Sequence, residues 1–368
     1  MSTLKKTFFA LTLLFATQQF VQAQTTEQAF SPSIKVKALI HSRFEASLTD
    51  SIDVAGKYFA NPVTTNFRMR RIELRTDIKL NDKFSGVVRV QLPELKGSSV
   101  GKVIELAYMD YKYNDMLNVR FGQFKSPFEL DEQTSHEDLR MIDRGPTSVM
   151  FVNNSLASYQ PGAMVFGTFM KSKTPLSYYL AFVNGSNRAV NNDDNSQKNI
   201  VGRLEFVPIK GVKIGANAQQ IYTKDTSGLS YGGDLSIIRD LNDKMKLIVE
   251  GEYITGYQVN DFNADTTGLE IGDYTMGGYF GQVLLRSELN KSWCKTFEVG
   301  GKYEHTDPNT TVDDNAFNTI TGGIGFIFTP DNMARLQLNI VHTDYEKTIT
   351  PGGLMAANMF VTQFQLKF

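Results

Sequence analysis

Four arginines, Arg68, Arg70, Arg71 and Arg75, lie within one short stretch of the sequence. Arg68 and Arg70 have one parity, whereas Arg71 and Arg75 have the other. Side chains of equal parity share a face of a strand, so all four face one way only if an extra residue shifts the register near Arg70 and Arg71. A row of guanidinium groups would attract anions; alternatively, the arginines pair with acids and only stiffen a sheet.

The densest group of charges lies in the longest polar link, residues 126–159. Its candidate residues, with the lysine just before it, are Lys125, Asp131, Glu132, Arg140 and Arg144. Arg140 and Arg144 are four residues apart, so one face of a short helix could present both. Long links in compact domains usually have a function. The link either folds over a passage and selects solutes by size and charge, or packs at a subunit contact.

The residue types on which enzymes rely are sparse. The four histidines, His41, His136, His305 and His342, have no metal-ligand spacing, and the common hydrolase, metalloprotease and phosphate-loop motifs are missing. A barrel lipase would need a serine beside His342, and the sequence identifies none. We therefore expect no catalytic residue, metal or cofactor. The formal net charge of −1 argues against nucleic acid as a partner.

The charged residues lie on segments that alternate with period two. In the last segment Phe360, Thr362, Phe364, Leu366 and Phe368 share one face, and Val361, Gln363, Gln365 and Lys367 share the other. The same pattern recurs in residues 84–92, 119–123, 200–206 and 335–343. A soluble β-sandwich also alternates, but in a membrane barrel the apolar face would meet lipid and the polar face a wet lumen.

Connection lengths favour the barrel. Short turns are expected at 81–82, 114–115, 173–175, 208–211, 242–243, 291–293 and 330–332. Longer links are expected at 49–63, 94–101, 126–159, 185–198, 224–230, 258–274, 307–315 and 347–356. The two kinds alternate strictly, which predicts an all-β, transmembrane antiparallel barrel of about 16 strands with short periplasmic turns and long extracellular loops.

The N-terminus has the layout of a secretory signal peptide over residues 1–23. Lys5 and Lys6 precede an apolar stretch, which ends in a small-residue cleavage pattern at Ala23. Residues 24–33 then form a short lead-in, and 34–368 form one barrel domain. Mean hydropathy is −0.24 and no later stretch is long and apolar enough for a membrane-spanning helix. With 26 Phe and 15 Tyr, a barrel that shows lipid every second side chain reconciles these facts.

The run FGQFKSPFELDEQTS, residues 121–135, resembles the phosphate-selective porin O and P family. Its matching positions are Gly122, Gln123, Phe124, Lys125, Pro127 and Phe128. Supporting stretches at 67–80, 201–216 and 326–346 appear in the family's order. The resemblance implies a 16-stranded barrel, usually a homotrimer, whose third loop folds into the lumen.

The sequence therefore predicts a passive diffusion channel in the outer membrane of a Gram-negative bacterium, for small hydrophilic solutes and preferably for anions such as phosphate. The candidate pore-lining, anion-binding residues are Arg68, Arg70, Arg71, Arg75, Arg89 and Arg120, with 126–159 as the constriction loop. The alternative is a barrel with a largely closed lumen whose surface loops bind a partner or a glycan. Expected partners are membrane lipid and the barrel-assembly machinery, which would read the terminal Phe368.

Overall fold

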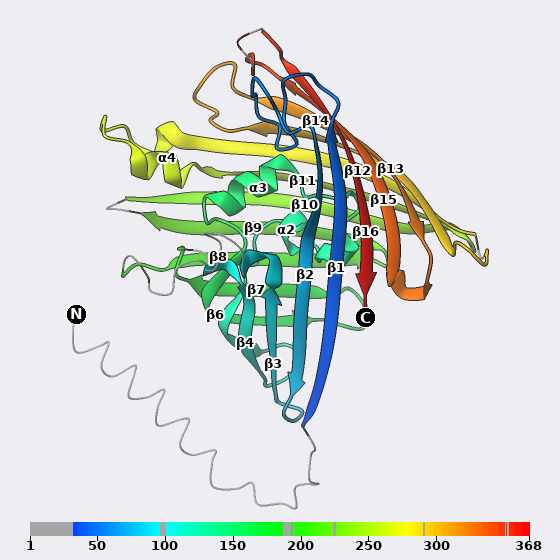
Figure 1. Ribbon diagram of the computed structural model, residues 1–368. Coiled ribbons are helices and arrows are strands. Elements are labelled where there is room, and N and C mark those ends of the chain that lie inside the picture. The colour runs from blue at the N-terminus through cyan, green and yellow to red at the C-terminus, as the bar shows by residue number, and fades with distance from the viewer. Residues whose placement is uncertain are drawn as a thin grey trace, which may run out of the picture.

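A computed structural model describes residues 32–95, 101–186, 193, 196–223, 226–289, 291–349, 351 and 353–368. The expected signal peptide and nearly all of the lead-in lie outside these ranges. Within them, sixteen antiparallel strands form a closed barrel in which each strand pairs with its sequence neighbours and β1 pairs with β16 (Figure 1). The predicted fold and strand number are confirmed.

The strands are β1 (Ser33–Ser47), β2 (Thr65–Lys79), β3 (Phe84–Gln91), β4 (Ile104–Lys112), β5 (Asn118–Lys125), β6 (Tyr159–Phe169), β7 (Leu176–Val183), β8 (Asn199–Ile209), β9 (Val212–Thr223), β10 (Thr226–Asn242), β11 (Met245–Tyr257), β12 (Thr275–Glu288), β13 (Thr296–Asp307), β14 (Phe317–Ile327), β15 (Ala334–Tyr345) and β16 (Ala356–Lys367). The short helices are η1 (Leu92–Leu95), α2 (Leu130–Gln133), η3 (His136–Asp138), α3 (Pro146–Asn153), α4 (Val259–Ala264), η4 (Ile271–Tyr274) and η5 (Pro330–Asn332). None of the described helices is long and apolar enough to cross a membrane.

The alternation sorts side chains as the sequence predicts. Outward residues such as Phe67 and Phe121 are 81% and 67% exposed, whereas inward polar residues such as Arg203, Gln219 and Gln365 are buried. Burying polar side chains while exposing phenylalanine suits a wall that has lipid outside and polar groups inside. Pairing of β1 with β16 leaves the barrel without a free strand edge.

Three of the short turns are closed by the same asparagine hydrogen-bond pattern. The side-chain carbonyls of Asn81, Asn114 and Asn242 each accept two backbone N–H groups from the residues that follow, at 2.8–3.0 Å. Asparagine favours such turns because its side chain substitutes for a backbone acceptor. These turns lie on the rim where β1 begins and β16 ends, since Phe368 pairs with Ala38 through the backbone.

The long link expected at residues 224–230 is wrong. Strand β9 continues to Thr223 and β10 begins at Thr226, with Ser227 already paired to Tyr222. The stretch Thr226–Ser230 looks like a loop in sequence because its inward residues are Gly228 and a buried Ser230. A lumen-facing strand tolerates small and polar residues that a soluble sheet would place in a connection.

Strand β2 contains the register shift that its four arginines require. His41 on β1 pairs with Arg71, but the next residue, Ser42, pairs with Met69, so Arg70 is the extra residue of a β-bulge. The bulge places Arg68 and Arg71 on the inner side of the wall despite their opposite parity. Phe67 and Met69 remain exposed on the outside.

Candidate functional site

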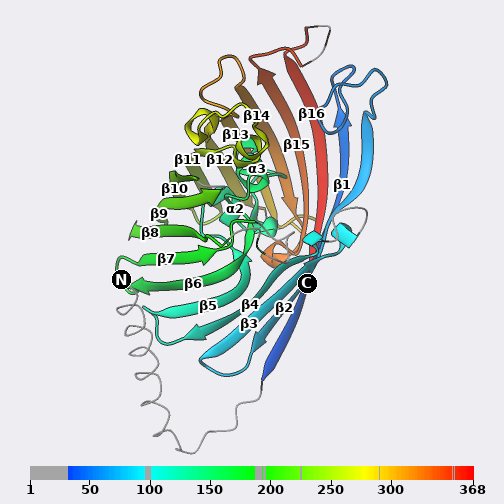
Figure 2. The ribbon, with the colours of Figure 1, turned by 90° about the vertical axis from the view of Figure 1, so that its left-hand side faces the viewer.

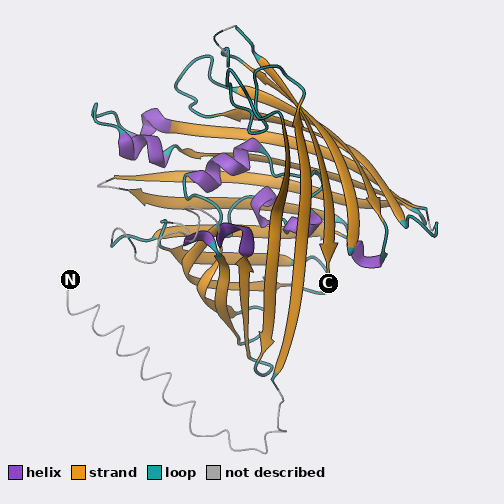
Figure 3. Ribbon diagram, in the orientation of Figure 1, coloured by secondary structure: helices purple, strands orange, loops and turns teal. Residues whose placement is uncertain are grey.

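The connection between β5 and β6 folds into the barrel instead of standing above its rim. It comprises residues 126–158 and includes α2, η3 and α3. In Figure 2 the strands curve around α2 and α3, and Figure 3 shows these short helices surrounded by strands. We call residues 126–158 the constriction segment, after the role that the sequence predicts for this loop.

Apolar side chains fix one side of the constriction segment to the wall. Phe128 and Phe151 are fully buried, and their stacked rings have centroids 5.9 Å apart. They pack in one cluster with inward residues of β6–β9, β11 and β12, namely Met164, Ala181, Val183, Val201, Ile221, Ile254 and Met276. The uniformly polar inner face expected from the alternation is therefore interrupted, because apolar wall residues here meet an apolar segment rather than water.

The run at residues 122–128 carries the chain from the wall into this cluster. Gly122 has φ +125°, and a Cβ at this position would lie 2.3 Å from the carbonyl oxygen of Ala107. Only glycine fits there without displacing β4. Phe124 and Phe128 are both fully buried in the cluster. The stretch that carries the family resemblance is thus the anchor of the constriction segment.

Polar contacts tie the constriction segment to the rest of the wall. They join Asp143 to Arg43 (2.8 and 2.9 Å), Asp131 to Lys302 (3.0 Å), Arg140 to Glu250 (3.1 Å), His136 to Glu73, and the carbonyl of Leu139 to Arg335 (3.0 Å). The wall partners come from β1, β13, β11, β2 and β15, respectively. The segment is therefore held around the whole circumference and crosses the lumen.

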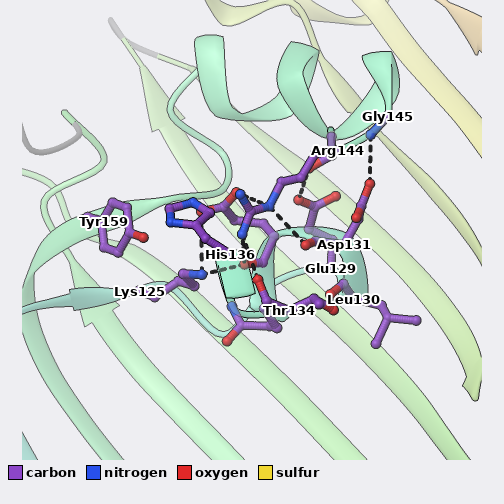
Figure 4. Close-up of polar contacts among 12 residues, drawn as sticks. Lys125, Glu129, Leu130, Asp131, Thr134, His136, Arg144, Gly145 and Tyr159 are labelled. Atoms are coloured by element: carbon purple, nitrogen blue, oxygen red, sulfur yellow. Dashed lines mark hydrogen bonds and ion pairs between the residues drawn. The ribbon is translucent and has the colours of Figure 1, made fainter. Parts of the chain in front are cut away.

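Of the charged residues predicted for the constriction, Lys125, Glu132 and Arg144 interact with one another within the segment, where Figure 4 shows its polar contacts. Arg144 donates to the carbonyl oxygens of Asp131 (2.9 Å) and Thr134 (2.6 Å), and it pairs with the Glu132 carboxylate (2.9 Å). Lys125 donates to the carbonyl of Glu132 (2.5 Å). These contacts stiffen the backbone of the segment, since each cation satisfies carbonyl groups that no strand pairs.

Arg140 and Arg144 do not share a helical face, which corrects the sequence-based expectation. Residues 139–145 form no helix. Gly145 precedes Pro146, the first residue of α3, and a residue before proline is pushed out of the helical region. Arg140 reaches across to Glu250 on β11, whereas Arg144 turns back over α2.

The six arginines predicted to line the pore fall into two sets. Four are paired with acids: Arg68 with Glu45 (2.6 Å), Arg75 with Asp77 (2.6 Å), Arg89 with Glu105 (2.9 Å) and Arg120 with Asp110 (2.7 Å). Arg70 and Arg71 contact no carboxylate among the described residues. The pairing with acids that the stiffening interpretation requires is thus present in four of the six arginines, and the anion-attracting interpretation stays a prediction for Arg70 and Arg71.

One residue at the centre of the site, Arg43, was missed by sequence reasoning. Arg43 on β1 donates two N–H groups to the Asp143 carboxylate and also donates to the side-chain oxygen of Gln363. Arg43 alternates with His41 and Glu45, so a charged face on the first strand was the available signal. Burial alone would raise the pKa of Asp143, but Arg43 and Arg70 outweigh it and hold that pKa below its usual range. Asp143 is therefore ionised at neutral pH.

Free space in the lumen is divided by the constriction segment. On its outer side, a cavity of about 380 Å³ lies against β1–β4 and another of about 360 Å³ lies against β13–β16. Arg68, Asp143, Arg144 and Val149 line both. Toward the short-turn rim, cavities of about 440 Å³ and 550 Å³ include Arg75 and Arg286, respectively. The segment is the partition between outer and inner halves of the lumen.

One mixed group of potential metal ligands lies in the wall beside the segment. Glu73, Glu105 and His136 are buried, with donor atoms within 4.8 Å of one another. Arg89 lies 2.9 Å from the Glu105 carboxylate and 3.6 Å from that of Glu73. Burial, with Arg71 next in effect, lowers the pKa of His136 well below its usual value. An arginine already takes the place of a cation here, so the group is best described as an ion-pair cluster.

The alternative of a lipase on the outer wall depends on His342. One ring nitrogen of His342 lies 2.8 Å from the side-chain oxygen of Asn358, and the other lies 3.0 Å from Asp344. Both nitrogens therefore face hydrogen-bond acceptors. A histidine base needs a hydroxyl or thiol on one side, and at His342 a carboxylate stands there instead.

Glu129 gives a pH-dependent prediction. It is fully buried, and burial, with Glu252 and Asp131 beside it, raises its pKa well above the usual range. The folded protein then holds a proton that the unfolded chain releases, so stability falls as pH rises through the interval between the two pKa values. We expect Glu129→Gln to remove this fall: it should be more heat-stable than the parent at about pH 8 and similar at about pH 4.

The measurement is the temperature at which the compact, heat-modifiable gel band is lost, at each pH. Asp314→Asn, on the exposed link between β13 and β14, is the matched control. Equal pH slopes for Glu129→Gln and the parent would contradict the raised pKa.

A closed barrel with an apolar outer face, whose lumen is crossed by an inward-folded segment, defines the class of outer-membrane porins. A model of the phosphate-selective porin O and P family matches residues 44–238, more than half of the sequence. The chain belongs to this family and is a passive diffusion channel of the outer membrane.

Solved structures share this architecture at low sequence identity. OmpF of Salmonella typhi, in complex with daunomycin, matches with a TM-score of 0.61 and 10% identity over 91% of this chain and 97% of that one. An anion-selective porin from Comamonas acidovorans matches with a TM-score of 0.59 and 11% identity over 92% of this chain and 100% of that one. The trimer form of OmpT from Vibrio cholerae matches with a TM-score of 0.56 and 11% identity over 92% of this chain and 100% of that one. These similarities show the fold alone, and no curated protein matches the chain.

Proposed function

We propose that this porin favours small anions and that selection takes place on the outer side of the constriction segment. The observation that carries the proposal is the cavity against β1–β4, where five arginines outnumber four acids. The arginines are Arg43, Arg68, Arg70, Arg71 and Arg144, and the acids are Glu94, Glu105, Glu132 and Asp143. An excess of cations along a wet pore lowers the cost of anion entry and raises that of cation entry. Phosphate remains one candidate solute, on the strength of the family.

The proposal also covers export, barrel assembly, oligomeric state and the lack of an enzymatic activity. Export by a signal peptide at residues 1–23 and reading of the exposed Phe368 by the barrel-assembly machinery follow from the sequence pattern. A homotrimer is supported by the family and by the trimer form of OmpT. A channel that is not an enzyme is supported by the family and by the acceptors around His342.

Reversal potentials across a salt gradient in planar bilayers test the anion preference. We expect the potential to indicate anion preference in the parent and to shift clearly toward cations in Arg70→Gln with Arg71→Gln, which removes two unpaired charges. The matched control is Arg120→Gln with Asp110→Asn, which removes a bonded pair without changing net charge. Its potential should equal that of the parent. An unchanged potential in the first variant would count against selection by these arginines.

The second candidate is a barrel whose lumen is largely closed and whose loops bind a partner or a glycan. The specific observation in its favour is that the constriction segment is bonded to five strands around the lumen. The same bilayer experiment separates the two candidates. Stepwise conductance at low protein load supports diffusion, whereas silence at high load supports the closed barrel.

A further inference from the structure

The cavity of about 380 Å³ on the outer side of the constriction segment is lined by five arginines and by four acids, Glu94, Glu105, Glu132 and Asp143. We call it the arginine cavity. Three of its five arginines have acidic partners: Arg43 binds Asp143 and Glu45, Arg68 binds Glu45, and Arg144 binds Glu132. Among the described residues, Arg70 and Arg71 form no direct ion pair with an acid, although the charge of Arg70 acts on Asp143 at longer range.

Arg70 and Arg71 are confined without an anion. The Nε of Arg70 is buried and has no hydrogen-bond partner in the described part of the chain. Arg71 is 4% exposed, and its side-chain contact is with His41, at 3.5 Å. Burying Arg71 and the Nε of Arg70 without an acceptor costs free energy, which a bound anion would recover. These two side chains are the part of the cavity that is built for a ligand and lacks one.

The occupant already present shows which shape of anion the cavity accepts. Asp143 lies on Arg43 with both carboxylate oxygens, at 2.8 and 2.9 Å, the two-point contact that suits a planar carboxylate on a planar guanidinium. Its side chain is 46% exposed, whereas that of Arg43 is 1% exposed, so a solute reaches this arginine only by displacing Asp143. Asp143 belongs to the constriction segment, not to the wall, so it is in effect a carboxylate that the protein places among its own arginines.

We propose that the arginine cavity is a binding site for small carboxylates, in which Arg70 and Arg71 anchor the solute and Asp143 competes with it for Arg43. The site deepens the proposed anion preference, because it names the solute class that pauses at the constriction. Asp143 keeps the affinity modest, and a diffusion channel requires that a bound solute leave again.

Isothermal titration calorimetry of the purified, detergent-solubilised barrel tests the site with malonate and sulfate as probes. Both are dianions near neutral pH, but only malonate carries planar carboxylates. We expect malonate to bind the parent more tightly than sulfate does. Asp143→Asn, which keeps the shape and frees Arg43, should tighten malonate binding about ten-fold. Arg70→Gln with Arg71→Gln should weaken it about ten-fold.

Arg71→Lys provides a second route if the double variant fails to give a heat-modifiable barrel. Lysine keeps the positive charge but lacks the planar guanidinium that binds a carboxylate at two points. The affinity for malonate should therefore fall, while that for sulfate changes little. Equal affinities for malonate and sulfate overturn the carboxylate assignment, and unchanged malonate affinity in Asp143→Asn overturns the competitor role. Anion preference without malonate binding overturns this site alone; malonate binding without anion preference overturns the proposed function and leaves the site intact.

Discussion

Replacing residues 135–142 with two glycines is expected to raise single-channel conductance several-fold. This stretch contains His136, Leu139 and Arg140, whose bonds to β2, β15 and β11 carry the constriction segment across the lumen. The two ends of the deletion lie within the reach of one arginine side chain, because the guanidinium of Arg144 donates to the carbonyl of Thr134 at 2.6 Å. The shortened segment can therefore keep its anchor on the β6–β12 wall while the crossing is removed. The measurement is conductance in planar bilayers at fixed salt.

The control is a rim loop shortened in the same way, with residues Thr310–Asp314 replaced by two glycines. All five of these residues are exposed, and none lines a lumen cavity. Its conductance should match that of the parent. If the deletion of 135–142 gives a compact, heat-modifiable barrel with parental conductance, the constriction lies elsewhere in the pore. That result would also remove the reason to place anion selection beside Asp143.

The wall of this barrel was readable from sequence because lipid and lumen impose opposite demands on alternate residues. Phe364 and Leu366 are exposed outside and Gln363 and Gln365 are buried inside, as the parity of the last segment predicts. Turn residues such as Asn81 added the strand boundaries, since their side chains close the turn locally. Both signals act between near neighbours in the chain.

The interior was harder to predict because its partners are distant in sequence. Arg43 and Asp143 are one hundred residues apart, and neither parity nor composition relates them. The inward apolar residues Val201 and Ile254 contradict the expected polar lumen, and only the position of Phe151 explains them. Long-range packing of a segment against a wall follows from tertiary structure, so local periodicity carries no trace of it.

The constriction segment has polar contacts on one side of the lumen and an apolar anchor on the other, and their magnitudes differ. A partly exposed ion pair such as Arg43–Asp143 is worth about 0–1 kcal/mol. Truncating a fully buried phenylalanine to alanine costs about 3–5 kcal/mol. Phe128 and Phe151 should therefore decide whether the segment stays folded in the lumen, while the ion pairs decide where its charges point.

Phe151→Ala is accordingly expected to loosen the constriction segment by about 3–5 kcal/mol. Open-channel current should become noisy, with excursions to higher conductance, because the segment leaves its place part of the time. Backbone amides of α3 should exchange hydrogen faster by mass spectrometry, while those of the strands keep their protection. Val149→Ala is the matched control, since Val149 lies on the same helix but is 47% exposed and lines the cavities.

A second variant approaches the same contact from the wall. Gly256 on β11 faces the lumen, and a Cβ there would lie 2.7 Å from Ser230 Oγ on the wall, 2.9 Å from Phe151 Cε1 and 3.1 Å from Leu156 Cδ1. Gly256→Ala should therefore push the anchor off the wall and reproduce the noise of Phe151→Ala without shortening any side chain. Both variants together should be little worse than either alone, because they disrupt one contact. Quiet channels in Phe151→Ala with parental α3 protection would show that the ion pairs hold the segment, and the energetic order argued above would be reversed.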